Sequence, residues 1–487
     1  MTDAETLKAK GRERLREHAL VAGRVVPAGP GAIPVDDPSD GSIIGSVPNL
    51  GAAETEEAIA AAADAFRAWS VAPPVERAAF LRRWAAKVDE HEEGLAALLA
   101  LENGKPFEEA LGEIRYANSF SKWFAGQAEA LAGVAQDSPT PDRLILTFKE
   151  AVGPVAAITP WNFPGAMITR KASAAFAAGC TVVLKPAAQT PFTAIALAEL
   201  AWEAGLDPRA FSVVTGDAGP IGEALTASPA IRKLSFTGST PVGRKLAEQC
   251  APTLKRLSLE LGGAAPLIVF DDADLDVAVA ETVKGKFRNS GQTCVCPNRV
   301  YVQRGVYDAY VARITEAVAA LKVGSPFEPG VKVGPLIDDK GLKKVADHVR
   351  RAVEAGGRVT VGGEPHARGG RFFQPTVVAG SDDRLFRDEE TFGPVVPVFP
   401  FDSEEEVIAK ANASEFGLAS YVFTRDLART LRVSRALENG IVGVNTGLIS
   451  NAVVPFGGVK QSGYGREGST LGLDEYLQVK SVTVATT

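Results

Sequence analysis

Residues 155–186 read VAAITPWNFPGAMITRKASAAFAAGCTVVLKP, and this stretch decides the fold class. Two short apolar runs, VAAIT (155–159) and TVVLKP (181–186), flank a segment from about residue 164 to 178 that predicts a helix. A strand, a helix and a second strand in this order predict a βαβ unit, in which the two strands are parallel. The stretch therefore indicates an α/β fold.

The alternation of short strands and helices continues along the chain, with a change of domain near residue 262. Further strand-like runs are FSVVTG (211–216), RKLSFTG (232–238), APLIVF (265–270), NRVYVQ (298–303), VVPVFPF (395–401) and SYVFT (420–424). We therefore predict two α/β domains. RLILTFKEAVG (143–153) and EYLQVKSVTVAT (475–486) are also strand-like but fit neither domain. Exposed lone strands invite pairing with another subunit.

The composition is that of an ordinary globular protein and argues against several classes. The 487 residues carry a net charge of −7 and no long Lys/Arg run, so nucleic acid is not an expected partner. The N-terminus lacks the apolar core of a signal peptide, and no apolar stretch reaches the roughly 18 residues of a membrane span. Four cysteines are too few for a disulfide framework in so long a chain. We expect a cytoplasmic protein with no membrane partner.

Two of the four cysteines, Cys294 and Cys296, stand together in NSGQTCVCPNR (289–299). A structural zinc site needs four ligands, usually in C-x2–4-C pairs, and this pair has no second pair to complete it, so no metal is expected. A redox pair and a catalytic nucleophile with a neighbouring thiol remain. None of the four histidines has a context typical of a general base, which argues against a Cys–His hydrolase.

Two other side chains could support a cysteine nucleophile. Glu260 in RLSLELGG (256–263) lies between leucines, where desolvation raises the pKa of a carboxyl group and suits a general base. An edge-facing glutamate on a strand would look the same. Asn162 follows a predicted strand and could donate its amide to a developing oxyanion, although Trp-Asn-Phe-Pro is also ordinary turn chemistry.

The cofactor signals are unusual. No G-x-G-x-x-G follows a strand, but FTGSTPVG (236–243) does follow one and opens a helix, so the amides after Gly238 could bind a pyrophosphate. The nearby VTGDAGPIG (214–222) is assigned to a loop and a helix start. The strand TVVLKP ends in Lys185, where a Rossmann enzyme would carry an acid for the ribose.

Together these stretches resemble the aldehyde dehydrogenase superfamily over nearly the whole chain. The matching motifs are TPWNFP (159–164), LKPA (184–187), FTGST (236–240), LELGG (259–263), GQTC (291–294), EETFGP (389–394) and PFGGVKQSG (455–463). The narrower likeness is to its succinate-semialdehyde and glutarate-semialdehyde branch. It rests on LENGKPFEEALGEIRYANSF (101–120), MITRKA (167–172), KFRNSGQTCVC (286–296) and GVNTGLIS (443–450).

The resemblance implies two Rossmann-like α/β domains and a small strand-forming oligomerisation arm. Residues 1–137 and 154–262 would bind the cofactor, and residues 263–460 would form the catalytic domain. Residues 138–153 and 474–487 would form the arm of a homodimer or homotetramer.

The resemblance also implies the chemistry. Cys294 would attack an aldehyde, Asn162 and the Cys294 amide would form the oxyanion hole, and Glu260 would activate the water that hydrolyses the thioester. Cofactor contacts would come from Trp161, Asn162, Lys185, Ala188, Gly238, Ser239, Leu261 and Glu390. In the semialdehyde branch, Arg170, Arg288 and Ser450 would bind the substrate carboxylate.

Two positions depart from the family pattern. Ala264 replaces the asparagine of LELGGN, which affects support of the loop after Glu260. Ala188 stands where a glutamate often binds the ribose, so we expect NADP to be used, with NAD as a second cofactor. The alternatives are a dehydrogenase for uncharged or aromatic aldehydes and a non-catalytic nucleotide-binding relative. Cys296 could form a reversible disulfide with Cys294 or could simply be a packing residue.

Overall fold

The computed structural model describes residues 4–486, and its first sheet is built on the predicted βαβ unit. The order of the strands is β2-β1-β9-β8-β7-β10-β11-β21, and β7 to β11 are parallel to one another. The strands are β1 (His18–Val21), β2 (Arg24–Pro27), β7 (Val155–Ile158), β8 (Val182–Lys185), β9 (Phe211–Val213), β10 (Lys233–Thr237), β11 (Arg256–Glu260) and β21 (Gly463–Tyr464).

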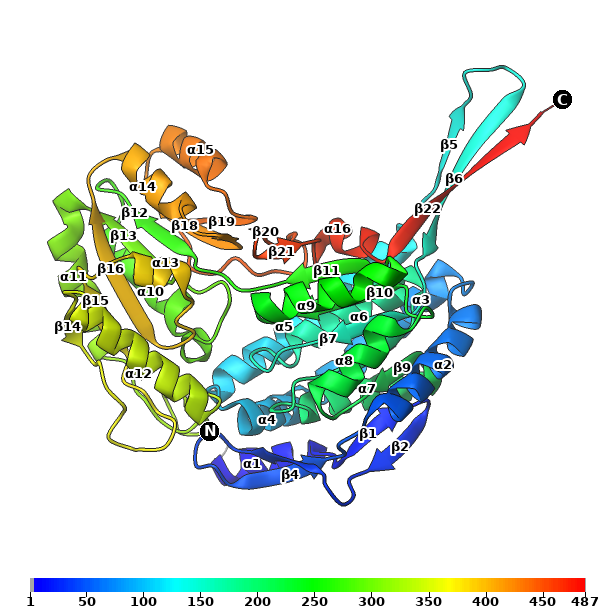
Figure 1. Ribbon diagram of the computed structural model, residues 1–487, viewed down its shortest axis with the longest axis horizontal. Helices are drawn as coiled ribbons and strands as arrows, with labels where there is room; N and C mark the ends of the chain where they lie inside the picture. The colour runs from blue at the N-terminus through cyan, green and yellow to red at the C-terminus, as the bar shows by residue number, and fades with distance from the viewer. Residues whose placement is uncertain (1–3, 487) are drawn as a thin grey trace.

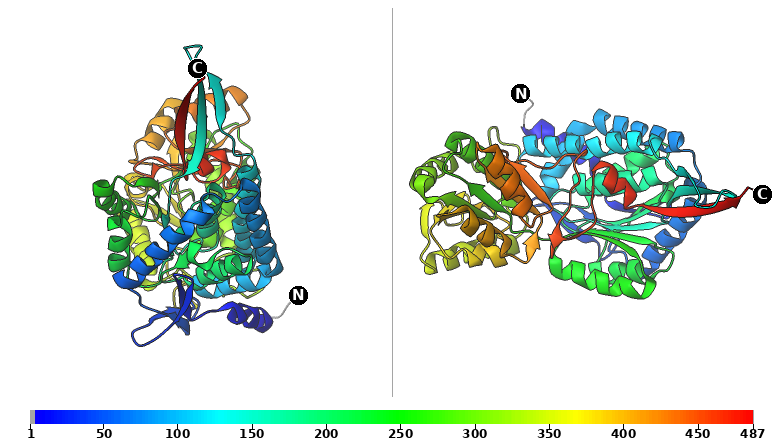
Figure 2. Two further views of the ribbon diagram at one scale, coloured as in Figure 1. Left: turned by 90° about the vertical axis from the view of Figure 1, so that its right-hand side faces the viewer. Right: turned by 90° about the horizontal axis from the view of Figure 1, so that it is seen from above.

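Helices cover both faces of this sheet (Figure 1, Figure 2). One face carries α3 (Pro74–Glu90), α4 (Glu92–Asn103), α5 (Phe107–Glu129), α6 (Ala166–Ala178) and α7 (Phe192–Glu203), and the other carries α2 (Ala52–Trp69), α8 (Ala218–Ala227) and α9 (Thr240–Cys250). Neighbouring residues of one strand pack into different cores: Val182 and Leu184 contact the first set of helices and Val183 the second. This alternation explains why β8 and β10 are buried at every position.

The second sheet has the order β14-β15-β16-β13-β12-β18-β19, with only β14 antiparallel to its neighbour. Its strands are β12 (Pro266–Val269), β13 (Arg299–Gln303), β14 (Arg358–Val361), β15 (Thr376–Ala379), β16 (Val395–Phe401), β18 (Ala419–Phe423) and β19 (Ile441–Val444). Its helices are α10 (Leu275–Phe287), α11 (Arg304–Ala319), α12 (Asp339–Glu354), α13 (Arg384–Asp388), α14 (Glu404–Asn412) and α15 (Leu427–Ala436). The prediction of two α/β units is confirmed.

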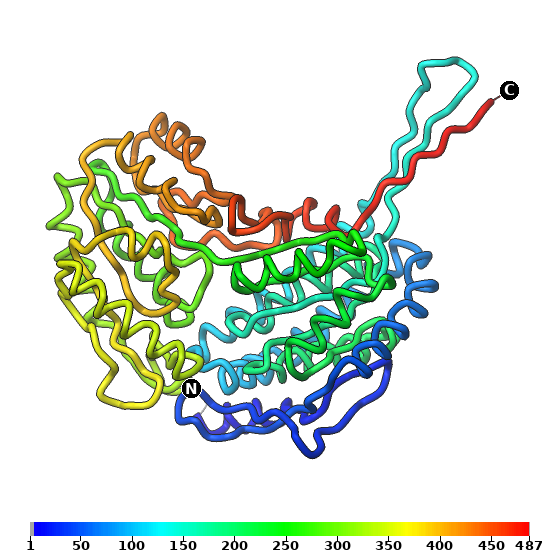
Figure 3. The backbone as a smooth tube through the Cα atoms, in the orientation of Figure 1, coloured from blue at the N-terminus to red at the C-terminus, as the bar shows by residue number. Residues whose placement is uncertain are grey.

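The two strand-like segments that fit neither unit pair with each other. β6 (Arg143–Ala151) and β22 (Leu477–Ala485) form an antiparallel ladder from Leu477↔Ala151 to Ala485↔Arg143. β5 (Val134–Asp137) completes this three-stranded arm, although it lies within the segment 1–137 predicted for the first domain. The arm projects from the body and carries the C-terminus at its tip (Figure 1, Figure 3).

The remaining elements are short or peripheral. They are α1 (Ala4–Arg14), β3 (Ile33–Asp36), β4 (Ile43–Val47), β17 (Phe416–Gly417), β20 (Val459–Lys460) and α16 (Ser469–Asp474), with short 3-10 helices η1 (Pro208–Ala210), η2 (Ala251–Thr253) and η3 (Arg288–Gly291). Within residues 4–486, no helix is long and apolar enough to cross a membrane.

Candidate active site

A cavity of about 360 Å³ lies where the carboxyl ends of β7, β10 and β11 face the second domain. In α/β proteins with parallel sheets, ligands bind at this end of the strands. The structure brings these predicted site residues together around the cavity: Trp161, Asn162, Gly238, Ser239, Leu261, Cys294 and Glu390. The second domain adds the beginning of α12, including Lys340 and Lys344, which sequence reasoning missed.

Cys294 is partly exposed to this cavity, in the loop after η3. Its enclosed position raises the pKa of the thiol to about 12; the Glu390 and Glu260 carboxylates add to this and Arg170 opposes it. The thiol is therefore protonated at neutral pH in this state, and a nucleophilic attack requires a base to remove the proton.

A tight turn precedes the cysteine and positions its loop. Asn289 and Ser290 both have left-handed backbone angles (φ 50° and 55°), and Gly291 follows with φ 77°. A side chain at Gly291 would place its Cβ 2.1 Å from the Gly393 carbonyl oxygen, so only glycine fits there.

Glu260 ends β11 and is 2% exposed. Within the described residues neither carboxylate oxygen has a hydrogen-bond partner. Burial, followed by the nearby Glu467 carboxylate, raises its pKa well above the ordinary value, while Arg170 and Lys171 act in the opposite direction. A buried carboxyl group with a raised pKa and free oxygens has the properties of a general base.

Glu467 is a second buried carboxylate that sequence reasoning missed. It forms ion pairs with both Arg170 and Lys171, and Lys171 also donates to the Thr237 hydroxyl at 2.8 Å. Burial would raise the pKa of Glu467, but the two cations outweigh it and hold the pKa below its ordinary value. Arg170 further lies 4.3 Å from the centre of the Phe456 ring. Arg170 thus already has an anionic partner within the protein.

The loop that carries Asn162 is supported by side chains from α5 and from the segment between α4 and α5. The Asn162 carbonyl oxygen accepts hydrogen bonds from Lys105 Nζ (2.8 Å) and Asn289 Nδ2 (2.9 Å). Lys105 is ion-paired with Glu113, whose carboxylate accepts the Gly165 amide at 2.9 Å. Asn162 Nδ2 donates to the Gln292 carbonyl oxygen at 3.0 Å. The side-chain amide of Asn162 has two N–H groups, so the second remains for a further acceptor. The motif LENGKP thus supports the candidate oxyanion donor, which local sequence did not reveal.

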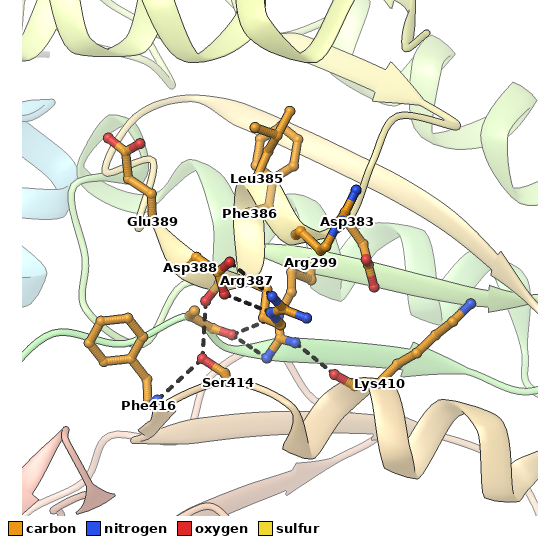
Figure 4. A network of polar contacts seen from close by, with 12 residues as sticks. Arg299, Asp383, Leu385, Phe386, Arg387, Asp388, Glu389, Lys410, Ser414 and Phe416 are labelled. Carbon is orange, nitrogen blue, oxygen red and sulfur yellow. Dashed lines mark hydrogen bonds and ion pairs between the residues drawn. The ribbon is translucent and has the colours of Figure 1, made fainter. Parts of the chain in front are cut away.

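Glu390 lies in the segment after α13, which a polar network holds in place (Figure 4). The Ser414 hydroxyl donates to the Arg387 carbonyl oxygen at 3.0 Å, and Asn298 Nδ2 donates to the Glu389 carbonyl oxygen at 3.0 Å. Burial raises the pKa of Glu390 to about 8, opposed by Lys344 and Lys286. In the described part of the chain, its Oε1 atom has no hydrogen-bond partner.

The same network explains how Ala264 is tolerated after LELGG. The buried Arg299 guanidinium donates to the Ala264 carbonyl oxygen through Nε (3.1 Å) and Nη2 (2.8 Å), and to the Lys410 carbonyl oxygen at 3.0 Å (Figure 4). These bonds use the backbone of residue 264, so they do not depend on an asparagine side chain.

A second cavity of about 270 Å³ contains Arg288 and Ser450, together with Tyr116 and Phe163. The Arg288 guanidinium lies 5.0 Å from the centre of the Phe163 ring, and within residues 4–486 it makes no ion pair. The Tyr116 hydroxyl is shielded from solvent and likewise has no partner among the described residues. Burial raises the pKa of Tyr116, against the effect of Arg170 and Arg288, so the phenol stays protonated and can donate a hydrogen bond.

The predicted adenosine contacts lie outside the first cavity. Lys185 ends β8 and is 6% exposed; Nζ donates to the Pro186 carbonyl oxygen at 3.1 Å. Burial lowers its pKa, and Asp217 opposes this, so a carboxylate that sequence reasoning missed lies within electrostatic reach of the lysine. Ala188 is exposed.

Ser239 is the N-cap residue of α9, and no side chain in the described structure caps this helix end.

The cavity between the two α/β units is thus lined by a thiol and by the free amides of a helix N-terminus, and the buried Glu260 carboxylate lies within electrostatic reach of the thiol. The model of the aldehyde dehydrogenase family matches residues 25–482. The glutarate-semialdehyde dehydrogenase of Pseudomonas aeruginosa is 54% identical over 97% of this chain and 99% of its own. The succinate-semialdehyde dehydrogenase [NADP(+)] GabD of Escherichia coli is 53% identical over 98% and 100%.

Comparison with solved structures indicates the same family. The crystal structure of an Escherichia coli NADP-dependent enzyme superposes with a TM-score of 0.96 and 53% identity, covering 97% of this chain and 99% of that one. The chain belongs to the aldehyde dehydrogenase family, so the predicted family and fold class are confirmed.

Proposed function

We propose that this enzyme oxidises an aldehyde with a terminal carboxylate, succinate semialdehyde or glutarate semialdehyde, to the dicarboxylate with NADP. The observation that carries this proposal is the Arg288 guanidinium, which makes no ion pair among the described residues and shares a cavity with Ser450 and Tyr116. The buried Glu109 lines the same cavity, and burial raises its pKa against the effects of Lys105 and Arg288. A guanidinium binds a carboxylate with two parallel hydrogen bonds. The names of the similar proteins from P. aeruginosa and E. coli support the same substrate class.

We assign the chemistry to three side chains. Glu260 takes the proton of the Cys294 thiol and passes it to solvent. The thiolate adds to the aldehyde carbon, and the amide of Asn162 with the Cys294 N–H stabilises the oxyanion of the thiohemiacetal. Loss of hydride from this intermediate leaves a thioester on Cys294. Glu260 takes a proton from the water that hydrolyses the thioester. The ionised form of Glu260 is needed for this step, so its raised pKa moves the onset of activity to higher pH.

The residues of the first cavity fit a nicotinamide nucleotide, which supplies the hydride acceptor when bound. Oε1 of Glu390 is a shielded acceptor with no partner in the described structure, which suits a ribose hydroxyl. The uncapped N-terminus of α9 at Gly238 and Ser239 suits a pyrophosphate. Trp161 and Leu261 would line the ring site. Lys185 beside the small Ala188 would accept a 2′-phosphate, and the E. coli relative is named for NADP(+).

Arg170 is assigned an electrostatic role toward the substrate, whereas Arg288 is assigned direct binding of the substrate carboxylate. Arg170 is ion-paired with Glu467 and also affects the pKa values of Tyr116, Cys294 and Glu260. It therefore adds positive potential near both cavities while it keeps its own partner.

The domain roles and the assembly are also proposed. The unit around the first sheet would bind the cofactor, the unit around the second would carry the nucleophile, and the arm would hold a homodimer or homotetramer together. Exposed apolar residues on the arm, Val134, Phe148 and Val479, support an interface there. The four cysteines are all free, which is consistent with the cytoplasm.

Steady-state kinetics would test the proposal most directly. We would compare succinate semialdehyde, glutarate semialdehyde and butanal, each with NADP and with NAD. A kcat/KM at least tenfold higher for one of the carboxylated aldehydes supports the proposal. Equal values for butanal would instead indicate a dehydrogenase for uncharged aldehydes.

A further inference from the structure

Lys286 is a fully buried lysine whose ammonium group has no carboxylate partner. It stands in the last turn of α10 and is 0% exposed. Within the described residues Lys286 makes no ion pair, and the single hydrogen bond of its Nζ atom goes to the sulfur of Cys296 at 3.6 Å. It lowers the pKa of Glu390, so that carboxylate is near, but the two groups are not in ion-pair contact. Buried lysines usually have an anionic partner, so this arrangement requires an explanation.

The two thiols of the TCVC segment have different surroundings. Cys294 is partly exposed and lines the first cavity. Cys296 is 3% exposed, does not line that cavity, and contacts the Gly291 carbonyl oxygen at 3.3 Å as well as Lys286. Burial raises the pKa of the Cys296 thiol, and Lys286 acts most strongly against this. The amine of Lys286 thus lies within hydrogen-bond distance of the Cys296 sulfur.

We propose that Cys296 and Lys286 form a covalent sulfur–nitrogen cross-link when the enzyme meets a hydroperoxide. The hydroperoxide oxidises the Cys296 thiol to a sulfenic acid, and its own O–O bond breaks to give an alcohol or water. Lys286 gives a proton to the sulfenic oxygen and its amine then attacks the sulfur; the S–N bond forms, the S–O bond breaks, water leaves, and one further proton is released to solvent. The net change is the loss of two hydrogen atoms. A dithiol reverses it by reducing the sulfur and releasing the amine.

The cross-link would tie α10 to the loop of the nucleophile. Cys296 lies two residues after Cys294 in the sequence. Its thiol donates a hydrogen bond to the carbonyl oxygen of Gly291, which precedes Cys294 by three residues. A bond to Lys286 would pull this loop toward α10 and change the position of Cys294. Cys296 would therefore act as a redox-sensitive modification site that needs no second thiol.

Mass spectrometry of a Cys294→Ser variant of the full-length enzyme tests the proposal, because the variant cannot form a disulfide between the two neighbouring thiols. After hydrogen peroxide treatment we expect an intact-mass decrease of about 2 Da that dithiothreitol reverses. Proteolysis should yield one cross-linked species joining the peptides of Lys286 and Cys296. Absence of the decrease, or a link mapped to Cys180 or Cys250, would overturn the proposal.

A matched variant tests whether the amine of Lys286 is needed in addition to the thiol of Cys296. Lys286→Arg in the Cys294→Ser background keeps the positive charge but provides no comparable nucleophile. Peroxide should then add one or two oxygen atoms to Cys296 and produce no cross-linked peptide. The same cross-linked species in this variant would refute the role of Lys286. If the variant does not fold, peptide mapping of Cys294→Ser alone decides between the outcomes.

Discussion

Replacing Arg288 by alanine should remove recognition of the substrate carboxylate with little damage to the fold. Among residues 4–486 the guanidinium makes no ion pair, and its ring contact with Phe163 is at 5.0 Å. A hydrogen bond to a charged group contributes about 1.5–3 kcal/mol. Since 1.36 kcal/mol corresponds to tenfold, kcat/KM for succinate semialdehyde should fall by about 10- to 150-fold, mainly through KM.

The assay compares two substrates and two arginines. For Arg288→Ala the kcat/KM for butanal should change by no more than about twofold, because butanal has no carboxylate to lose. Arg170→Ala serves as the matched comparison. It leaves Glu467 buried with Lys171 as its remaining ion-pair partner, and breaking such a pair costs about 3–5 kcal/mol of stability. We expect it to lower the melting temperature and the activity on both substrates.

The result that refutes this reasoning is an equal loss on both aldehydes for Arg288→Ala. Such a loss would mean that Arg288 positions the loop of Cys294, which lies six residues further on, and does not bind substrate. A selective loss in Arg170→Ala without a change in stability would move the carboxylate site to Arg170.

The other predictions concern catalysis, cofactor and oxidation. Cys294→Ala should abolish turnover and keep cofactor binding, measured by fluorescence titration; retained turnover would exclude the cysteine as nucleophile. Glu260→Gln should give a burst of reduced cofactor of about one equivalent followed by slow turnover, and a normal steady state would show that another group activates the water. Ala188→Glu should shift preference from NADP toward NAD, as a 2′-phosphate would meet a carboxylate; a wild type that ignores NADP contradicts the basis of this change. Cys296→Ala should keep activity but lose the recovery by dithiothreitol after peroxide, and full recovery would leave Cys296 as a packing residue.

Local sequence was sufficient for the fold class and the family. Both faces of a parallel sheet are covered, so its central strands contain continuous apolar runs such as VVL (182–184), and this pattern is visible within a few residues. The uncapped start of α9 also depends on the backbone immediately around it. The motifs that contain Cys294, Glu260 and Asn162 each had an ordinary structural alternative, and they indicated the family only together and in order.

The tertiary structure decided what depends on distant segments. Lys171 and Glu467 are 296 positions apart, and β6 and β22 pair across more than 300 residues, so no local pattern predicts either contact. The support of Asn162 by Lys105 and the partner of Arg170 were hidden for the same reason. The pKa of Cys294 is raised by burial and by the carboxylates of Glu390 and Glu260, which come from separate segments, so it also depends on the fold. The sequence determined which chemical groups are present, whereas folding decided which of them are neighbours and which are shielded from water, and these two conditions set their reactivity.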